Sequence, residues 1–73
     1  MEYTIKLEDL ECAHCAAKME KKIAKLKGVS ACAISFLTQK LKLTLEEGVA
    51  IEAIIPEIAA IVKKIEPDCR VIF

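Results

Sequence analysis

The chain has 73 residues, enough for one small domain that buries about 60% of the surface of its unfolded chain. It is 55% hydrophobic and 4% aromatic, with two glycines and two prolines, so the disordered, collagen-like and low-complexity classes are excluded. Eleven basic residues balance eleven acidic ones, and the net charge of zero gives no overall field that would draw the chain to nucleic acid or anionic lipid.

The first residues alternate between apolar and polar side chains over 2–8, which predicts a half-buried strand. The period then becomes helical over 13–27, and Gly28 lies where a helix C-cap is expected. The apolar stripe of this helix consists of Ala16, Met19, Ile23 and Leu26.

The middle of the chain predicts two strands, over 31–37 and 40–45, joined by a tight connection at Thr38 and Gln39. The inward positions of the first are Cys32, Ile34 and Phe36, and those of the second are Leu41, Leu43 and Leu45.

The last third predicts a loop over 46–48, an amphipathic helix from Ile51 to Ile65 and a short final strand over 69–73. Pro56 interrupts the helical pattern, so the regular helix is expected to start later than the periodicity indicates, or to be kinked.

The predicted order is βαββαβ, an α+β fold in a single domain over residues 1–73. Right-handed crossovers give a ferredoxin-like sandwich, in which a four-stranded antiparallel sheet has two helices on one face. The usual order of this fold puts the first and third strands in the centre of the sheet. It also puts the loop after the first strand beside the loop before the fourth.

The chain has no apolar run near the ~18 residues that span a bilayer, and its N-terminus lacks the basic and apolar regions of a signal peptide. The expected location is therefore cytoplasmic, with no membrane segment in this chain. Four cysteines could form a disulfide scaffold with three alternative pairings. A core rich in Ile and Leu and the missing export signal favour reduced thiols instead.

The functional signal is the Cys12-Ala13-His14-Cys15 motif at the junction of the first strand and the first helix. Two thiols at this spacing can bind one ion or form one disulfide. Cys15 falls in or near the first helical turn, where free N–H groups and the helix dipole are expected to lower its pKa.

Three interpretations of the motif compete. A thioredoxin-type redox pair lacks the flanking Trp and the internal Pro, and the chain is short for that fold. A structural zinc site needs four ligands, and the sequence has no second pair of this spacing. An open, exchangeable metal site needs only the two cysteines, and the context favours it.

The segment Leu10–Val29, LECAHCAAKMEKKIAKLKGV, resembles the heavy-metal-associated domain of metallochaperones and metal-exporting P-type ATPases. The resemblance covers the whole chain, including the tail Lys63–Asp68, and the chain in particular resembles the N-terminal domains of cadmium-, zinc- and lead-exporting ATPases. It implies that Cys12 and Cys15 bind the metal.

Ligand chemistry then favours Zn²⁺ or Cd²⁺, with Pb²⁺ as a further candidate and copper(I) less favoured. Copper-handling members usually have Met two residues before the first cysteine and Thr or Ser directly before it, whereas this chain has Leu10 and Glu11. A carboxylate beside two thiolates adds an oxygen ligand and a third negative charge, which suits a divalent ion. Glu11 is therefore a candidate ligand, and its alternative is a solvated loop carboxylate.

The other candidate residues have simpler interpretations. His14 is expected to point to solvent, Cys32 to be a small buried hydrophobe, and Met19 to belong to the core. Cys69 is expected in the core, and its alternative is contact with the metal or with one of the metal's ligands. The segment Lys18–Lys27 has five basic residues and one acid, so it is either a solvated face or a docking surface.

The predicted function is metal binding by the N-terminal domain of a heavy-metal-translocating ATPase, with no catalysis by the domain itself. A free metallochaperone of the same fold, for copper(I) or zinc, is the alternative, and a small thiol oxidoreductase is the third. The expected partners are the metal ion and either other domains of a parent ATPase or its transmembrane metal entry site. The domain is expected to be a monomer that binds no nucleic acid.

Overall fold

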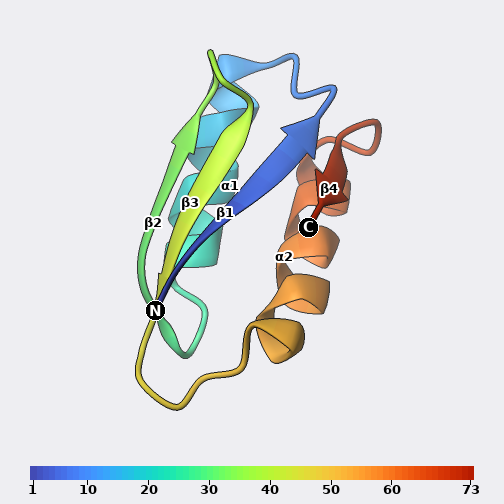
Figure 1. Ribbon diagram of the computed structural model, residues 1–73. Helices are drawn as coiled ribbons and strands as arrows, with labels where there is room; N and C mark the ends of the chain where they lie inside the picture. The colour runs from blue at the N-terminus through green and yellow to red at the C-terminus, as the bar shows by residue number, and fades with distance from the viewer.

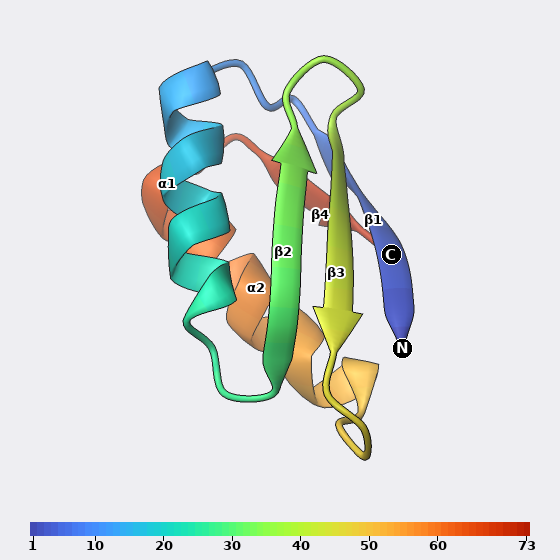
Figure 2. The same cartoon turned by 90° about the vertical axis from the view of Figure 1, so that its left-hand side faces the viewer.

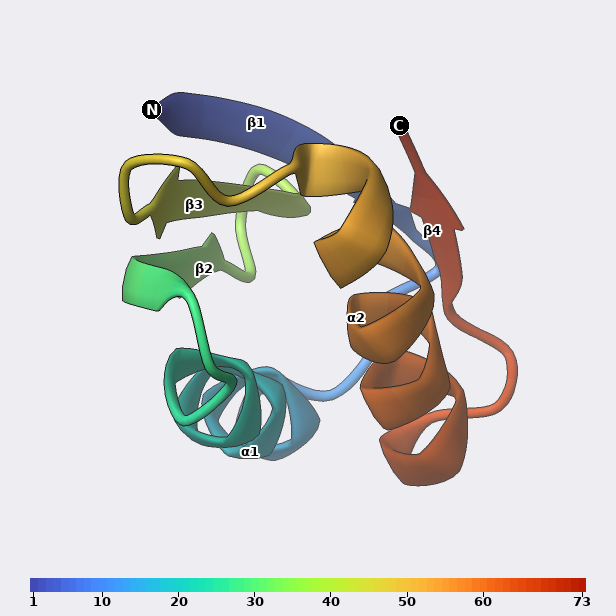
Figure 3. The ribbon, with the colours of Figure 1, turned by 90° about the horizontal axis from the view of Figure 1, so that it is seen from below.

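The computed structural model describes residues 1–73 as four strands and two helices in the order βαββαβ. The strands are β1 (Glu2–Glu8), β2 (Val29–Ser35), β3 (Lys40–Leu45) and β4 (Arg70–Ile72), and the helices are α1 (Ala13–Ala24) and α2 (Ile51–Ile65). Neighbouring strands are antiparallel, in the order β2-β3-β1-β4. Both helices cover the same face of the sheet (Figures 1 and 3). The predicted ferredoxin-like sandwich is therefore confirmed.

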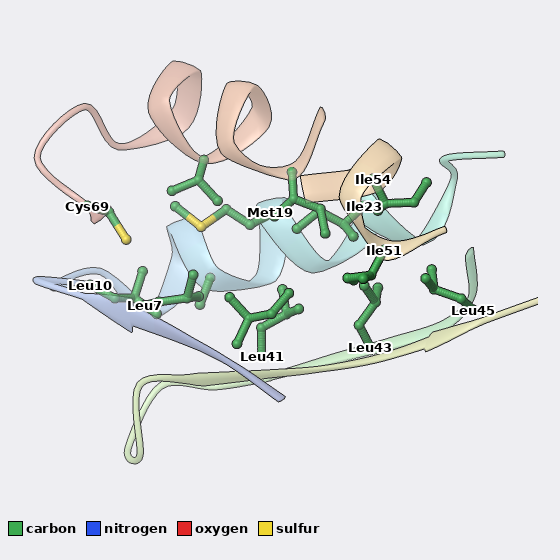
Figure 4. Close-up of a cluster of buried hydrophobic side chains, with 14 residues drawn as sticks. Leu7, Leu10, Met19, Ile23, Leu41, Leu43, Leu45, Ile51, Ile54 and Cys69 are labelled. Carbon is green, nitrogen blue, oxygen red and sulfur yellow. The ribbon is translucent and has the colours of Figure 1, made fainter. Parts of the chain in front are cut away.

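One hydrophobic core lies between the sheet and the helices, and fourteen buried residues form it (Figure 4). Along β3 the inward positions are Leu41, Leu43 and Leu45, none more than 2% exposed. The helices add Met19, Ile23, Ile58 and Val62, which have no exposed surface. Each fully buried side chain of this size stabilises the fold by roughly 1.5–3 kcal/mol.

The first helix is shorter than predicted, because α1 ends at Ala24 and not at Lys27. The N–H of Leu26 already bonds the carbonyl of Ile23, 3.0 Å away, in a tight turn. Gly28 then has a φ of +95°, and a Cβ there would lie 3.0 Å from both γ-methyl groups of Val49. Gly28 thus allows the chain to reverse early, and β2 begins at Val29.

The turn after β2 also differs from the prediction. Strand β2 ends at Ser35, so Phe36 and Leu37 lie in the turn, where they are 37% and 92% exposed. The inward position predicted for Phe36 is therefore wrong. Gln39 closes the turn with a φ of +58°, and its N–H bonds the carbonyl of Ser35 at 2.9 Å.

The second helix begins at Ile51, so a later start caused by Pro56 is wrong. Pro56 lacks the N–H that would bond the carbonyl of Glu52, but both residues are exposed, on the side of the helix where water can reach that carbonyl. The final strand covers only Arg70–Ile72, and Phe73 is 65% exposed.

Strand β2 forms one edge of the sheet, and α1 lies beside it (Figure 2). The backbone N–H of Ile34 in this strand donates to Oε2 of Glu20 in α1, at 2.8 Å. A side chain of the covering helix therefore satisfies a backbone group that β3 does not pair.

Candidate metal centre

One residue of the turn between β2 and β3, Gln39, holds the loop between β1 and α1. The N–H of Leu10 donates to Oε1 of Gln39 at 3.1 Å, and Nε2 of Gln39 donates back to the carbonyl of Leu10. The side chain of Leu10 is 1% exposed and belongs to the core. The chain is thus fixed two residues before Cys12. Sequence reasoning missed Gln39, whose only sequence signal is its place in a predicted turn.

Cys12 is the N-cap of α1, with extended φ and ψ of −130° and 114°. Its sulfur accepts the backbone N–H of Cys15 at 3.2 Å, and its carbonyl accepts the N–H of Ala16 at 3.0 Å. Cys12 therefore takes the place that Ser, Thr or Asp usually has at a helix start. The structure brings the two cysteines of the motif together, as free and half-buried thiols.

The two thiols are electrostatically different. Hydrogen bonds from the side chain and the backbone N–H of Cys15 lower the pKa of Cys12. The pKa of Cys15 is raised, first by its hydrogen bond to Cys12 and then by burial. The expectation that Cys15 is the activated thiol is therefore wrong. The reason is local geometry, because the free N–H at the helix start points to the capping sulfur of Cys12.

The other residues that the sequence suggested as metal ligands or neighbours of the metal site do not join the pair. Glu11 and His14 are exposed, and Cys32 is half-buried against the core. No three His, Cys, Asp or Glu side chains lie close enough together to hold a metal ion in this conformation. A metal-binding role for Glu11 thus stays a prediction.

Cys69 is only 6% exposed, and its side chain points into the core on the side of Leu10 (Figure 4). Burial, with Glu66 and Asp9 nearby, raises the pKa of Cys69 to about 11. Because Glu8 at the end of β1 pairs with Arg70 at the start of β4, the loops after the first strand and before the fourth are neighbours, as predicted. The core position predicted for Cys69 is confirmed, and contact with a metal stays a prediction.

Sequence reasoning missed Glu66, which directly follows α2. Its negative charge partly offsets the lowering of the pKa of Cys12, and it adds to the raised pKa of Cys15 and of Cys69, which have larger causes. Its Oε2 atom is buried and has no hydrogen-bond partner. Nothing near Glu66 in the sequence indicates this position, because the tertiary fold alone brings the end of α2 to the start of α1.

Lysine side chains line a groove of about 480 Å³ that begins at Cys15 and lies between α1 and the end of α2. The lysines are Lys18, Lys21, Lys22, Lys25 and Lys64. Most of the basic residues predicted as a docking surface therefore share one concave face with a cysteine of the motif. Their use for docking stays a prediction.

Neither helix is long and apolar enough to cross a membrane.

Residues 4–69 match the family model of the heavy-metal-associated domain. A search of curated protein sequences found no match.

Solved structures share the fold at low sequence identity. The metallochaperone CsoZ is 16% identical, with a TM-score of 0.76 over 100% of this chain and 97% of its own. The copper transporter domain Ccc2a of yeast is 24% identical, with a TM-score of 0.72 over 99% and 94%. The N-terminal domain of a potential copper-translocating P-type ATPase of Bacillus subtilis, in its Cu(I)-loaded state, is 18% identical, with a TM-score of 0.74 over 99% and 84%.

Proposed function

This chain belongs to the heavy-metal-associated domain family, and from that premise we propose that Cys12 and Cys15 bind one heavy-metal ion as a cargo that is later passed on. The observation that carries the proposal is the Cys12 cap, which keeps both sulfurs at the start of α1, with the sulfur of Cys12 accepting the N–H of Cys15 at 3.2 Å. Two half-buried thiols hold a soft ion and can release it, because only one short loop has to move.

We propose Zn²⁺ or Cd²⁺ as the ion, with Pb²⁺ as a further candidate. Leu10 and Glu11 stand where copper-handling members have Met and Thr or Ser, and the carboxylate of Glu11 favours a divalent ion. The second candidate is copper(I), which two thiolates satisfy without an oxygen ligand. It is favoured by the structural neighbours, since several of them are described as copper proteins.

The domain acts by binding and delivery, and its proposed context is the N-terminus of a heavy-metal-translocating P-type ATPase in the cytoplasm. A free metallochaperone is the alternative. The downstream reading frame separates the two, because transmembrane helices and an Asp-Lys-Thr-Gly-Thr phosphorylation motif would establish the ATPase. In either context the lysine groove beside Cys15 is the proposed docking face for an acidic partner.

The test is an anaerobic titration of the reduced protein with Zn²⁺, Cd²⁺, Pb²⁺ and copper(I). One ion per monomer is expected for the wild type, and none for Cys12→Ser combined with Cys15→Ser, because a neutral hydroxyl is a poor ligand for soft ions. Cys32→Ser is the matched control, since Cys32 packs against the core away from the motif. Undiminished binding by the double variant would refute the proposal. Replacing Glu11 by Thr tests the selectivity, with weaker binding of the divalent ions and unchanged copper(I) binding expected.

A further inference from the structure

The face of the sheet that neither helix covers has no part in the proposed metal site (Figure 3). Three exposed lysines lie on it, Lys6 on β1 and Lys40 and Lys42 on β3. They share this face because they alternate with core residues along both strands, and neighbouring positions of a strand point to opposite sides of the sheet. Three positive charges are thus gathered on one solvent-exposed surface.

The strand register brings two of these charges directly opposite each other. Lys6 of β1 pairs with Lys40 of β3, and Lys42 lies two residues further along β3. Directly opposite side chains have Cβ atoms about 4.5–5.5 Å apart and diagonal ones about 7–8 Å, so three long lysine side chains can reach one point above the sheet. Like charges directly opposite are destabilising, and the one salt bridge of the protein joins Arg70 to Glu8. An anion would therefore relieve a repulsion that no carboxylate of the protein relieves.

A hollow of about 460 Å³ lies over β2 and β3 on the side of these lysines. Lys40 and Lys42 line it together with Ser35 and Thr38, and Ser35 is the register partner of Lys40. The hydroxyl oxygen of Ser35 accepts the N–H of Thr38 at 3.3 Å, which leaves the proton of this hydroxyl free to donate. The hollow thus offers ammonium and hydroxyl donors, and no carboxylate lines it.

These donors suit the oxygens of a small phosphate compound. Lysine binds phosphate as a point charge, and each phosphate group carries about 1.5–2 negative charges at pH 7, so two linked phosphates balance three lysines better than one does. An extended polyanion fits less well, because the net charge of the protein is zero and Glu2 and Glu8 lie at the two ends of the same face of β1. A small anion lies between these two acids and avoids both.

We propose that the open face of the sheet binds a soluble diphosphate compound, with the three lysines around its oxygens and the hydroxyls of Ser35 and Thr38 as further donors. The site is separate from the cysteine pair, so the inference does not rest on the proposed metal binding.

The lysine groove beside Cys15 is the natural comparison. It has five lysines, but no hydroxyl group lines it, and four of the five follow one another along α1. On the open face, by contrast, paired strands fix the spacing of the lysines before any ligand arrives. Such preorganisation lowers the entropy that binding costs.

The experiment measures binding of inorganic diphosphate to the reduced, metal-free protein, by calorimetry and by thermal melting, in a chloride buffer of low ionic strength. We expect one diphosphate per chain, and a melting temperature that rises with its concentration because the ligand binds the folded state. Orthophosphate and sulfate should bind more weakly. Amide signals followed by NMR during the titration should shift first around Ser35, Lys40 and Lys6.

Variants separate the proposed site from the lysine groove. Lys40→Gln should weaken diphosphate binding about tenfold, because it removes a charge-assisted hydrogen bond at the centre of the site. Lys21→Gln, in the groove, is the matched control and should leave binding unchanged. Without diphosphate, Lys40→Gln should melt no lower than the wild type, since the change removes the repulsion from Lys6, whereas a structural role for Lys40 would lower the melting temperature. Thr38→Val keeps every charge and should still weaken binding through the lost hydroxyl.

The proposal is overturned if sulfate at equal ionic strength binds as tightly as diphosphate, which would show a general response to salt. It is also overturned if Lys40→Gln binds as the wild type does, or if Lys21→Gln weakens binding as much as Lys40→Gln, which would place the anion in the groove. Tighter binding to vesicles of anionic lipid than to diphosphate would assign the face to a membrane instead. The Cys12→Ser, Cys15→Ser double variant should bind diphosphate as the wild type does, so failure of the metal site and failure of this site are seen separately.

Discussion

The four thiols should react with an alkylating reagent at widely different rates, since their environments differ. Burial raises the pKa of Cys32 and of Cys69 from 9.0 to about 11. At pH 8 a thiol of pKa 11 is about one part in a thousand thiolate, whereas one of pKa 9 is about one part in ten, so these two core thiols should react about 100-fold more slowly than an ordinary cysteine. Cys12 should react fastest, because its pKa is lowered, and Cys15 should follow.

The assay is timed carbamidomethylation of the reduced, metal-free protein at pH 8, with quenched samples digested and each cysteine peptide quantified by mass spectrometry. The same reaction in concentrated guanidinium is the control, where all four rates should converge because the fold is gone. Zn²⁺ should protect Cys12 and Cys15 alone if they form the site. Reaction of Cys32 or Cys69 at a rate within a few-fold of Cys12 in the folded protein would refute the electrostatic reasoning.

Three other outcomes are expected. Gly48→Ala should cost about 1–2 kcal/mol, because φ is +87° and the added methyl meets nothing. Gly28→Ala should cost about 1–3 kcal/mol more, since its methyl meets Val49. Equal losses of unfolding free energy in urea would contradict this, and in a Val49→Ala background the extra loss at Gly28 should disappear. Gln39→Ala should lower the free energy of unfolding by about 1–3 kcal/mol and weaken metal binding, because both backbone groups of Leu10 lose their hydrogen-bond partner. Unchanged Zn²⁺ affinity would show that the loop before Cys12 does not need Gln39. The free energy of unfolding should fall as the pH rises from 9 toward 11. In the unfolded chain thiols ionise near pH 9, whereas Cys32 and Cys69 in the folded protein ionise only near pH 11. A free energy of unfolding that stays constant up to pH 11 would contradict those pKa values.

The sheet and the core could be predicted from the sequence because the alternation of apolar and polar residues alone decides them. The alternation of Leu41, Leu43 and Leu45 has a single solution, a strand with its leucines inward, and the structure has it. The ends of helices and strands follow less directly from the sequence, because the helical period and the turn residues compete there. Leu26 fits the apolar stripe of α1, but it also fits the turn that Gly28 permits, and the turn is what the structure contains.

The candidate site also has features that the sequence predicts and features that only the packing of the chain decides. The spacing of Cys12 and Cys15 is local, so the sequence predicted that they come together at a helix start. Which thiol is activated depends on a backbone angle at Cys12, and no residue pattern encodes that angle. The end of α2 comes to the start of α1 only through the packing of the two helices, which places Ile65 and Cys15 along one groove, so no local residue pattern predicts it.

The bond between Glu20 and the N–H of Ile34 has a consequence for the protein in a crowded cell. An edge strand with free backbone groups can recruit the strand of another molecule and start an intermolecular sheet. Here the carboxylate occupies a donor that an incoming strand would need, and it places a negative charge where that strand would approach. Two copies of the protein can thus meet at β2 without joining edge to edge.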